Sequence, residues 1–391
     1  MKRRDLALLC AGVLCFWLFA LAFGTSQGRG LAVQTAGEPA PAPAAEAPAV
    51  LPTAASPLAL NCRAAILVDQ ASGTVLYEKD PDQPMPMASI TKVMTLLLTF
   101  EAIHQGRFTL DTPVPVSEHA YHMGGSQIWL EPGEQFTLDE MIKAICVCSA
   151  NDAAVAVAEL GMEHTTFHNA CGLDTQGHQS TARDVAVMSR QILNTCPEVL
   201  HYTGIWTDSL RDGATQLVNT NKLLRRYQGI TGLKTGTTGG AGVCISASAT
   251  REGLSLIAVV LGAPSSKDRF DAATALLDYG FGGWQAAPLP EPEPRPLQLK
   301  VVGSAEAGVP LDYGALPQTI LLPRQGAAEL TVELELPEQL EAPVTKGQTL
   351  GTARVLQGDQ ELGRYPVQAA ADAPRMGFGT AFGLLWGSLT S

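Results

Sequence analysis

Three short motifs place side chains at spacings that could carry acyl transfer through a serine. They are Ser89-Ile-Thr-Lys92, Ser149-Ala-Asn151 and Lys234-Thr-Gly236. A serine and a lysine three residues apart leave one face of a helix, so the amine can take the proton of the hydroxyl. Lys92 must be neutral to do so, which requires a pKa lowered by burial or by a second cation such as Lys234. The first motif therefore predicts a nucleophile with its own base.

The second motif predicts a proton relay in a turn between two helices. Ser149 could pass a proton between Lys92 and a leaving amine, and Asn151 could hold a substrate amide. Read alone, the motif is more often a helix-capping turn.

The third motif predicts a carboxylate-binding strand edge. Lys234 would bind the carboxylate together with the hydroxyls of Thr235 and Thr237, and Gly236 would let a ligand approach the backbone closely. We expect the backbone N–H groups of Ser89 and Thr237 to form an oxyanion pair, supported by the positive dipole at the helix start.

Composition excludes one class of partner. The chain has 391 residues and a formal net charge of -12, whereas nucleic acid binding needs a basic face. Hydrophobic residues make up 46 % and charged residues 16 %, which favours a globular chain with room for more than one domain.

The N-terminal region has the pattern of an export segment. Lys2, Arg3 and Arg4 precede an uncharged, mostly apolar stretch from Leu6 to Phe23. Residues 1–26 are predicted to be a secretory signal, and an uncleaved anchor stays an alternative. The Ala/Pro-rich residues 27–57 are typical of an extended linker.

The cysteines and histidines give no metal-binding spacing. Six cysteines lie beyond the export segment, mostly in apolar runs, so buried thiols are favoured over disulfides. The seven histidines form no HExxH-like cluster, and no metal site is predicted.

The elements that must position the motifs are those of an α+β domain. Two hairpins are predicted, one from Ala64–Val68 with Thr74–Tyr77 and one from Val243–Thr250 with Leu254–Leu261. Between them lies a long helical region, in which Thr137-Leu-Asp-Glu140 forms a capping box. A helix at Lys267–Tyr279 follows, so the sheet would be assembled from both ends of the domain.

Composition changes divide the chain further. We predict a catalytic domain at 58–284, a Pro-rich linker at 285–296, a small β domain at 297–372 and a tail at 373–391. Leu330–Leu336 alternates as a half-buried strand does. Met376–Ser391 is uncharged and amphipathic but too short to span a bilayer, so a helix lying in the membrane interface is predicted, with a tail packed on its own domain as the alternative.

The chain resembles the serine-type D-alanyl-D-alanine carboxypeptidases, the low-molecular-mass penicillin-binding proteins. The resemblance covers residues 60–283 and extends to 297–372. It rests on the three motifs and on segments such as Gly124-Gly-Ser-Gln-Ile-Trp-Leu-Glu-Pro-Gly133, Asn219-Thr-Asn-Lys222 and Gly232-Leu-Lys-Thr-Gly236. It implies the fold of the serine β-lactamase and penicillin-binding group, an antiparallel sheet with a helical subdomain, followed by a small all-β domain and a C-terminal amphipathic helix.

The resemblance also implies roles for the site residues. Ser89 would be acylated by the stem pentapeptide of peptidoglycan, and by β-lactam antibiotics, with Lys92 as proton acceptor. Ser149 and Asn151 would complete the relay and position the substrate. Lys234 and Thr235 would hold the terminal carboxylate. No cofactor is implied, and the enzyme would be exported and work at the outer face of the cytoplasmic membrane, facing the cell wall.

The chain departs from the family pattern at one place, and two alternative functions stay open. Glu159 runs directly into Leu160-Gly-Met162, where the family carries about twenty further residues. We expect a looser helical subdomain with the chemistry retained. The alternatives are a β-lactamase, although no Glu-x-x-Leu-Asn string follows the second motif, and a non-catalytic penicillin-binding protein of the cell wall.

Overall fold

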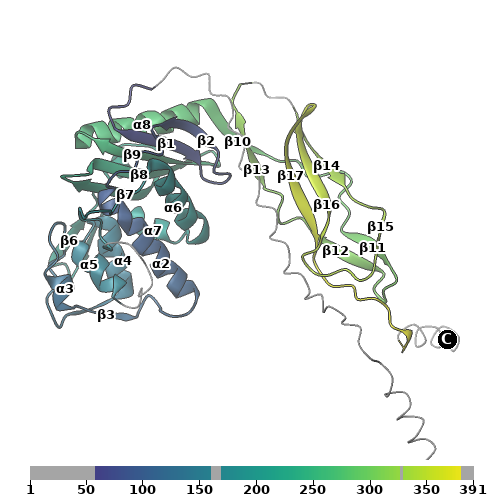
Figure 1. Ribbon diagram of the computed structural model, residues 1–391, viewed down its shortest axis with the longest axis horizontal. Coiled ribbons are helices and arrows are strands. Elements are labelled where there is room, and N and C mark those ends of the chain that lie inside the picture. The colour runs from purple at the N-terminus through teal and green to yellow at the C-terminus, as the bar shows by residue number, and fades with distance from the viewer. Residues whose placement is uncertain (1–57, 160–168, 326–328, 380–391) are drawn as a thin grey trace, which may run out of the picture. The chain divides into compact units, whose positions relative to one another are not determined.

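The computed structural model describes residues 58–159, 169–325 and 329–379, and every structural statement below concerns these residues (Figure 1). The predicted export segment and Ala/Pro-rich linker (1–57), the site of the predicted deletion (160–168) and most of the predicted tail (380–391) lie outside them. Within the described ranges, no helix is both long enough and apolar enough to cross a membrane.

A five-stranded antiparallel sheet forms the centre of the catalytic domain, with the strand order β2-β1-β9-β8-β7. Both predicted hairpins are confirmed, and they meet where β1 pairs along its length with β9. The strands are β1 (Ala64–Asp69), β2 (Val75–Lys79), β7 (Ile230–Thr238), β8 (Gly242–Arg251) and β9 (Leu254–Ala263). The sheet is thus built from both ends of the domain, as the sequence predicts.

Alternation along the central strands creates two separate apolar cores. On β9, Ile257 and Val259 point toward the helical region, whereas Leu256 and Val260 point toward α8 (Ser266–Gly283). Because successive strand residues face opposite sides, a strand buried on both faces is apolar throughout. Figure 1 shows α8 on one side of the sheet and α6 on the other.

The helical region between β2 and β7 carries most of the catalytic motifs. The predicted capping box is confirmed: the Thr137 hydroxyl accepts from the Glu140 N–H, and the Glu140 carboxylate accepts from the Thr137 N–H. The helices are α2 (Lys92–His104), α3 (Glu118–Tyr121), α4 (Leu138–Val147), α5 (Asn151–Ala158), α6 (Ala182–Thr195) and α7 (Val199–Thr203), with 3₁₀ turns η1 (Ala88–Thr91) and η2 (Lys222–Arg225). Two short hairpins complete the region, β3 (Pro113–Pro115) with β4 (Gln135–Thr137) and β5 (Thr207–Leu210) with β6 (Thr215–Val218).

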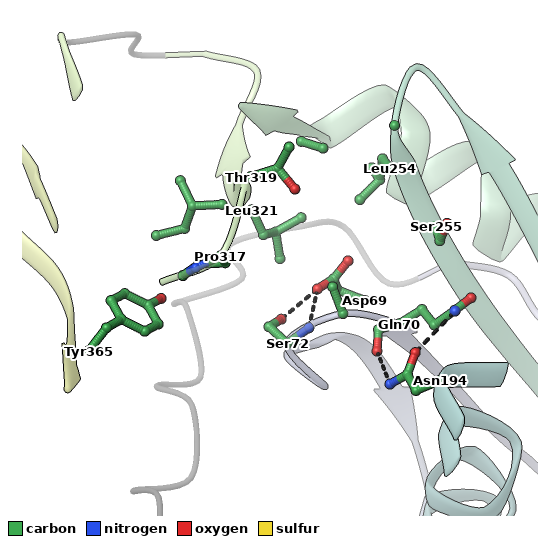
Figure 2. Close-up of a pocket in the computed structure, with 14 residues that line it drawn as sticks. Asp69, Gln70, Ser72, Asn194, Leu254, Ser255, Pro317, Thr319, Leu321 and Tyr365 are labelled. Carbon is green, nitrogen blue, oxygen red and sulfur yellow. Dashed lines mark hydrogen bonds between the residues drawn. The ribbon is translucent and has the colours of Figure 1, made fainter. Parts of the chain in front are cut away.

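The turn between β1 and β2 is tied to α6 beside a pocket that contains no residue of the three motifs (Figure 2). Asp69 accepts from the N–H and the hydroxyl of Ser72, which closes the turn. Gln70 and Asn194 exchange hydrogen bonds, Gln70 Nε2 to Asn194 Oδ1 and Asn194 Nδ2 to the Gln70 carbonyl. These contacts fix the first hairpin against the helical region.

The residues after α8 form the predicted small β domain. Its main sheet has the order β14-β16-β17-β12-β11-β15. On β14, Val332 is buried between exposed Thr331 and Glu333, which confirms the half-buried strand. The predicted Pro-rich linker opens with strand structure, because β10 (Trp284–Pro288) pairs with β13 (Thr319–Pro323). The other strands are β11 (Gln298–Val302), β12 (Gly308–Asp312), β14 (Leu330–Glu335), β15 (Gln339–Glu341), β16 (Thr349–Gln357) and β17 (Gln360–Ala369).

Candidate active site

Ser89 and Lys92 lie at the start of α2, where the sequence predicts them. Ser89 belongs to the 3₁₀ turn η1 and Lys92 is the first residue of α2. The Lys92 ammonium donates to Ser89 Oγ (2.9 Å), Asn151 Oδ1 (2.6 Å) and the Cys171 carbonyl (2.9 Å). The Lys92 side chain is 0 % exposed, and this burial lowers its pKa to about 8. At neutral pH a minor fraction of this amine is therefore neutral, far more than for a surface lysine, and it contacts the candidate nucleophile as general-base catalysis requires.

Asn151 connects this base to a loop that borders the site. Its Nδ2 donates to the Gly124 carbonyl (2.6 Å), and its backbone N–H donates to the Ser126 carbonyl (2.7 Å). Asp152, fully buried, accepts from the N–H groups of Ile128 and Leu130 and so holds the same loop. Asn151 and Asp152 therefore hold both Lys92, the candidate base, and the loop beside it.

Ser149 contacts Lys234, the lysine predicted to bind the substrate carboxylate. Its backbone has a positive φ of 62°, an uncommon conformation that turns the chain sharply between α4 and α5. Lys234 Nζ donates to Ser149 Oγ (2.8 Å) and to the Thr235 carbonyl (3.0 Å). The sequence predicts Ser149 as a relay for Lys92, whereas the hydrogen bond that the structure gives its hydroxyl comes from Lys234.

Lys234 is as deeply buried as Lys92, with 1 % of its surface exposed. Burial, and then the like charge of Lys92, lowers the pKa of Lys234 to about 7. For Lys92, burial is the largest cause of its lowered pKa. The two lysines therefore form a buried pair that holds fewer protons than two surface lysines would.

Two glycines allow the backbone of the nucleophile turn to pack closely. A Cβ on Gly236 would lie 2.9 Å from the Met87 carbonyl oxygen and 3.0 Å from Ser89 N. A Cβ on Gly172, which has a φ of +85°, would lie 1.9 Å from the Ala88 carbonyl oxygen. Because β7 and the loop that contains Gly172 both pack against the turn η1, the Ser89 N–H is fixed beside the strand that carries Thr237.

The two threonine hydroxyls of β7 have different environments. Thr235 is buried and its hydroxyl is paired with that of Thr220 (2.6 Å). Thr237 is exposed, and its hydroxyl donates only to the neighbouring Gly236 carbonyl (2.8 Å) among the described residues. Thr237 is therefore the hydroxyl that can reach an incoming carboxylate directly, with Lys234 and Thr235 behind it.

Two supporting residues have no role in the sequence-based prediction of the site. Arg269, buried on α8, donates to the carbonyls of Gly236 (3.3 Å) and Cys244 (3.2 Å). His178, also buried, pairs its Nε2 with the Thr91 hydroxyl (2.9 Å) in the nucleophile turn. Arg269 lies on the apolar face of an amphipathic helix, where a local pattern predicts a hydrophobic residue. His178 lies in one of the segments that carry the family resemblance, and only that could have pointed to it.

The arrangement as a whole suits acyl transfer. Ser89 Oγ contacts the amine of Lys92, whose pKa is lowered. The amine of Lys234 contacts Ser149 Oγ, and the exposed Thr237 lies on the same strand as Lys234.

In the described part of the chain, six cysteines are free thiols, five of them buried, in line with the expectation of buried thiols.

Comparison with known proteins agrees with this chemistry. A sequence model of the D-alanyl-D-alanine carboxypeptidase family matches residues 51–160 and 157–265, two segments that meet at the predicted deletion. A model of the C-terminal domain of penicillin-binding protein 5 matches residues 307–375.

Individual relatives extend the match over most of the chain. It is 36% identical to the D-alanyl-D-alanine carboxypeptidase DacF of Bacillus subtilis, over 83% of this chain and 88% of the relative. It is 31% identical to DacC of Escherichia coli, over 84% and 87%.

Solved structures show the same fold. Penicillin-binding protein 5 of Haemophilus influenzae aligns with a TM-score of 0.69 at 26% identity, over 82% of this chain and 100% of that one. Penicillin-binding protein D2 of Listeria monocytogenes, solved with bound ampicillin, aligns with a TM-score of 0.52 at 31% identity, over 58% and 100%. The chain belongs to the family of serine-type D-alanyl-D-alanine carboxypeptidases.

Proposed function

We propose that the chain removes the terminal D-alanine of peptidoglycan stem pentapeptides through an acyl-enzyme on Ser89. The observation that carries this assignment is the contact between Ser89 Oγ and the buried Lys92 Nζ, whose pKa is lowered to about 8. In its neutral form Lys92 accepts the Ser89 proton along this contact as Oγ attacks the penultimate carbonyl.

The developing negative charge would lie between two backbone donors. Ser89 N–H is packed against Gly236, and Thr237 N–H follows directly on the same strand. The leaving D-alanine amine takes its proton through Ser149 Oγ, which is in contact with Lys234. The lysine pair keeps one proton overall, because the proton that Lys92 takes from Ser89 replaces the one given to the amine. Water then adds its hydroxyl to the acyl carbon and its proton restores the Ser89 hydroxyl, which releases the tetrapeptide.

Substrate recognition follows from charge and exposure. The terminal carboxylate lies against Thr237, and a protonated Lys234 attracts it from behind. Asn151, held between Lys92 and Gly124, presents its amide to the substrate backbone. β-Lactams carry a carboxylate and a reactive carbonyl, and they would acylate Ser89 in the same way.

The place of action is part of the same proposal. The charged and apolar pattern of residues 1–26 supports export, and the uncharged amphipathic residues 376–391 support association with the outer face of the cytoplasmic membrane. The substrate, which is cell-wall peptide, requires a site outside the cytoplasm.

The test combines a peptide and an inhibitor. The full chain is incubated with a pentapeptide ending in D-Ala-D-Ala and, separately, with labelled penicillin, and released D-alanine and protein-bound label are measured. Ser89→Ala should lose both signals. Ser255→Ala should keep both, because this hydroxyl pairs only with the exposed Thr250 hydroxyl among the described residues.

Three results would overturn the proposal. D-Alanine release by Ser89→Ala would exclude Ser89 as nucleophile. Steady turnover of penicillin, in place of one label per chain, would indicate a β-lactamase. Label without D-alanine release would indicate a non-catalytic penicillin-binding protein.

A further inference from the structure

A second group of reactive side chains lies at the far end of the catalytic helix. His104 is the last residue of α2, Cys196 follows the last residue of α6, and Glu198 precedes α7. One donor atom from each of them, an imidazole nitrogen, a sulfur and a carboxylate oxygen, lies within 4.8 Å of the other two. Lys92 and His104 are at opposite ends of a 13-residue helix, so this group is separate from the active site.

The distances suit coordination of one ion after a small adjustment. Ligand atoms of a tetrahedral zinc site are separated by about 3.5 Å, because the bonds to the metal are about 2.0 to 2.3 Å long. His104 Nε2 and Glu198 Oε1 are 2.6 Å apart, and this distance would have to increase slightly for both atoms to bind one ion. Both side chains are about half exposed, which leaves room for them to move apart, whereas Cys196 is buried and its sulfur is held in place.

The electrostatic environment favours a cation. α2 and α6, with 13 and 14 residues, both end at this group, and the carboxyl end of a helix carries partial negative charge. Glu101, one turn before His104, adds a second carboxylate to this end of α2. An imidazole, a thiolate and a carboxylate are the donor set that borderline divalent ions such as Zn²⁺ prefer.

A comparison within the chain separates this group from an ordinary ion pair. His119 pairs with Glu159 (2.9 Å) and His122 with Glu118 (3.6 Å), and all four side chains are exposed. Among the described residues, only the His104–Glu198 pair has a thiol within coordinating distance. His104 and Cys196 are far apart in the sequence, so no short sequence motif can predict this group.

We propose that His104, Cys196 and Glu198 form a binding site for one Zn²⁺ ion, with water as the fourth ligand. The ion would join the end of α2 to the junction of α6 and α7, and its role would be to stabilise this corner of the helical region. The site is independent of the assigned carboxypeptidase activity.

Binding has a proton balance that can be measured. Cys196 is a free thiol, and zinc binds cysteine sulfur as the thiolate. Formation of the Zn–S bond displaces the thiol proton to solvent, and the imidazole of His104 binds in its neutral form. One proton should therefore be released per ion, and affinity should rise as pH increases.

The experiment uses the full chain freed of metal with a chelator. Zn²⁺ is titrated by calorimetry in buffers of different ionisation heat, which gives the affinity and the protons released. Co²⁺ is then bound as a spectroscopic probe, because a cobalt–thiolate bond produces a charge-transfer absorption. We expect one ion per chain, one proton released, and a thiolate band. Penicillin labelling of Ser89 reports that each variant is folded.

The variants distinguish this site from incidental binding. His104→Ala, Glu198→Gln and Cys196→Ser should each weaken Zn²⁺ binding by at least ~10-fold, and Cys196→Ser should abolish the thiolate band. His119→Ala removes a histidine from a similar pair without a thiol, and Cys62→Ser removes a thiol elsewhere. Both controls should bind as the unmodified chain does. Equal weakening by His119→Ala, or a cobalt spectrum without the thiolate band, would overturn the proposal.

Discussion

At the scale of single residues, the site depends on two lysines that the fold removes from water. Lys92 and Lys234 are 0 % and 1 % exposed, and both have lowered pKa values, about 8 and about 7. Two ammonium groups in one buried site repel each other, so the pair titrates as a unit. Because Lys234 has the lower pKa, the single proton lies mainly on Lys92, and we expect acylation of Ser89 through the less populated form, with Lys92 neutral and Lys234 charged.

The rate of penicillin acylation should therefore depend on pH as a bell-shaped curve. Below the lower pKa of the pair, both lysines are charged, and the rate should rise about tenfold per pH unit as one proton is lost. Above the higher pKa, both are neutral, and the rate should fall because the inhibitor carboxylate loses its cation. Stopped-flow acylation between about pH 5.5 and pH 10 measures both limbs.

Lys234→Arg is the matched variant for this profile. A guanidinium stays charged throughout that range, so the falling limb should disappear while the rising limb remains. A profile for Lys234→Arg that still falls at high pH would contradict the assignment of the second limb to Lys234.

At the scale of elements, catalysis depends on how closely two segments pack on the turn η1. Gly172 and Gly236 leave no room for a side chain on either side of residues 87–89. Met85 and Ser180 exchange backbone hydrogen bonds, which holds the segment before the turn against the loop after Gly172. The position of the Ser89 N–H is therefore set by neighbours that are distant in the sequence.

Gly172→Ala should abolish most acylation of Ser89 while the chain still folds. The added methyl would overlap the Ala88 carbonyl oxygen at 1.9 Å, which forces the nucleophile turn to move. Labelled penicillin measures acylation, and circular dichroism measures folding.

Gly213→Ala is the control for backbone strain. Gly213 has a similar φ of +94°, but a Cβ there would have no neighbour within 4 Å. It should lose only about 1 to 2 kcal/mol of stability and acylate normally. Equal loss of acylation in both variants would show that glycine flexibility, and not packing on η1, is what matters.

The sequence predicts local features of this site well and long-range ones poorly. The capping box of α4, the two hairpins and the contact of Ser89 with Lys92 follow from spacing within one element. The contact of Ser149 with Lys234 and the buried Arg269 behind Gly236 depend on how separate elements pack. The 3₁₀ turn before α2 also differs from the plain helix start that the sequence predicts. Ala88 has a φ of +52°, and an alanine gives no indication of a positive φ in the sequence.

At the scale of the whole molecule, the catalytic domain is followed by a β domain and by the predicted tail. Met376–Ser391 lacks charge and places five large apolar residues at helical spacing. We expect this tail to bind lipid through apolar burial alone, because no lysine or arginine follows Arg375.

Removal of residues 380–391 should therefore release the protein from vesicles without loss of carboxypeptidase activity. The comparison uses two chains that both lack residues 1–26, sedimented with vesicles of neutral phospholipid and with vesicles containing anionic lipid. Binding of the longer chain should be insensitive to salt and to the anionic fraction. Co-sedimentation of the shorter chain to the same extent would contradict the prediction.

The pairing of β1 with β9 has a consequence for the order in which the enzyme matures. Val68 lies opposite Ile257, so β1 gains its inner neighbour only after nearly the entire catalytic domain has been made. A two-stranded hairpin is marginally stable by itself, and contacts between distant segments form slowly. Ser89 also needs β7 beside it. A chain still under synthesis thus carries its serine and lysine long before β7 and β9 have been added to complete their surroundings, and we expect penicillin to label only chains that extend past β9.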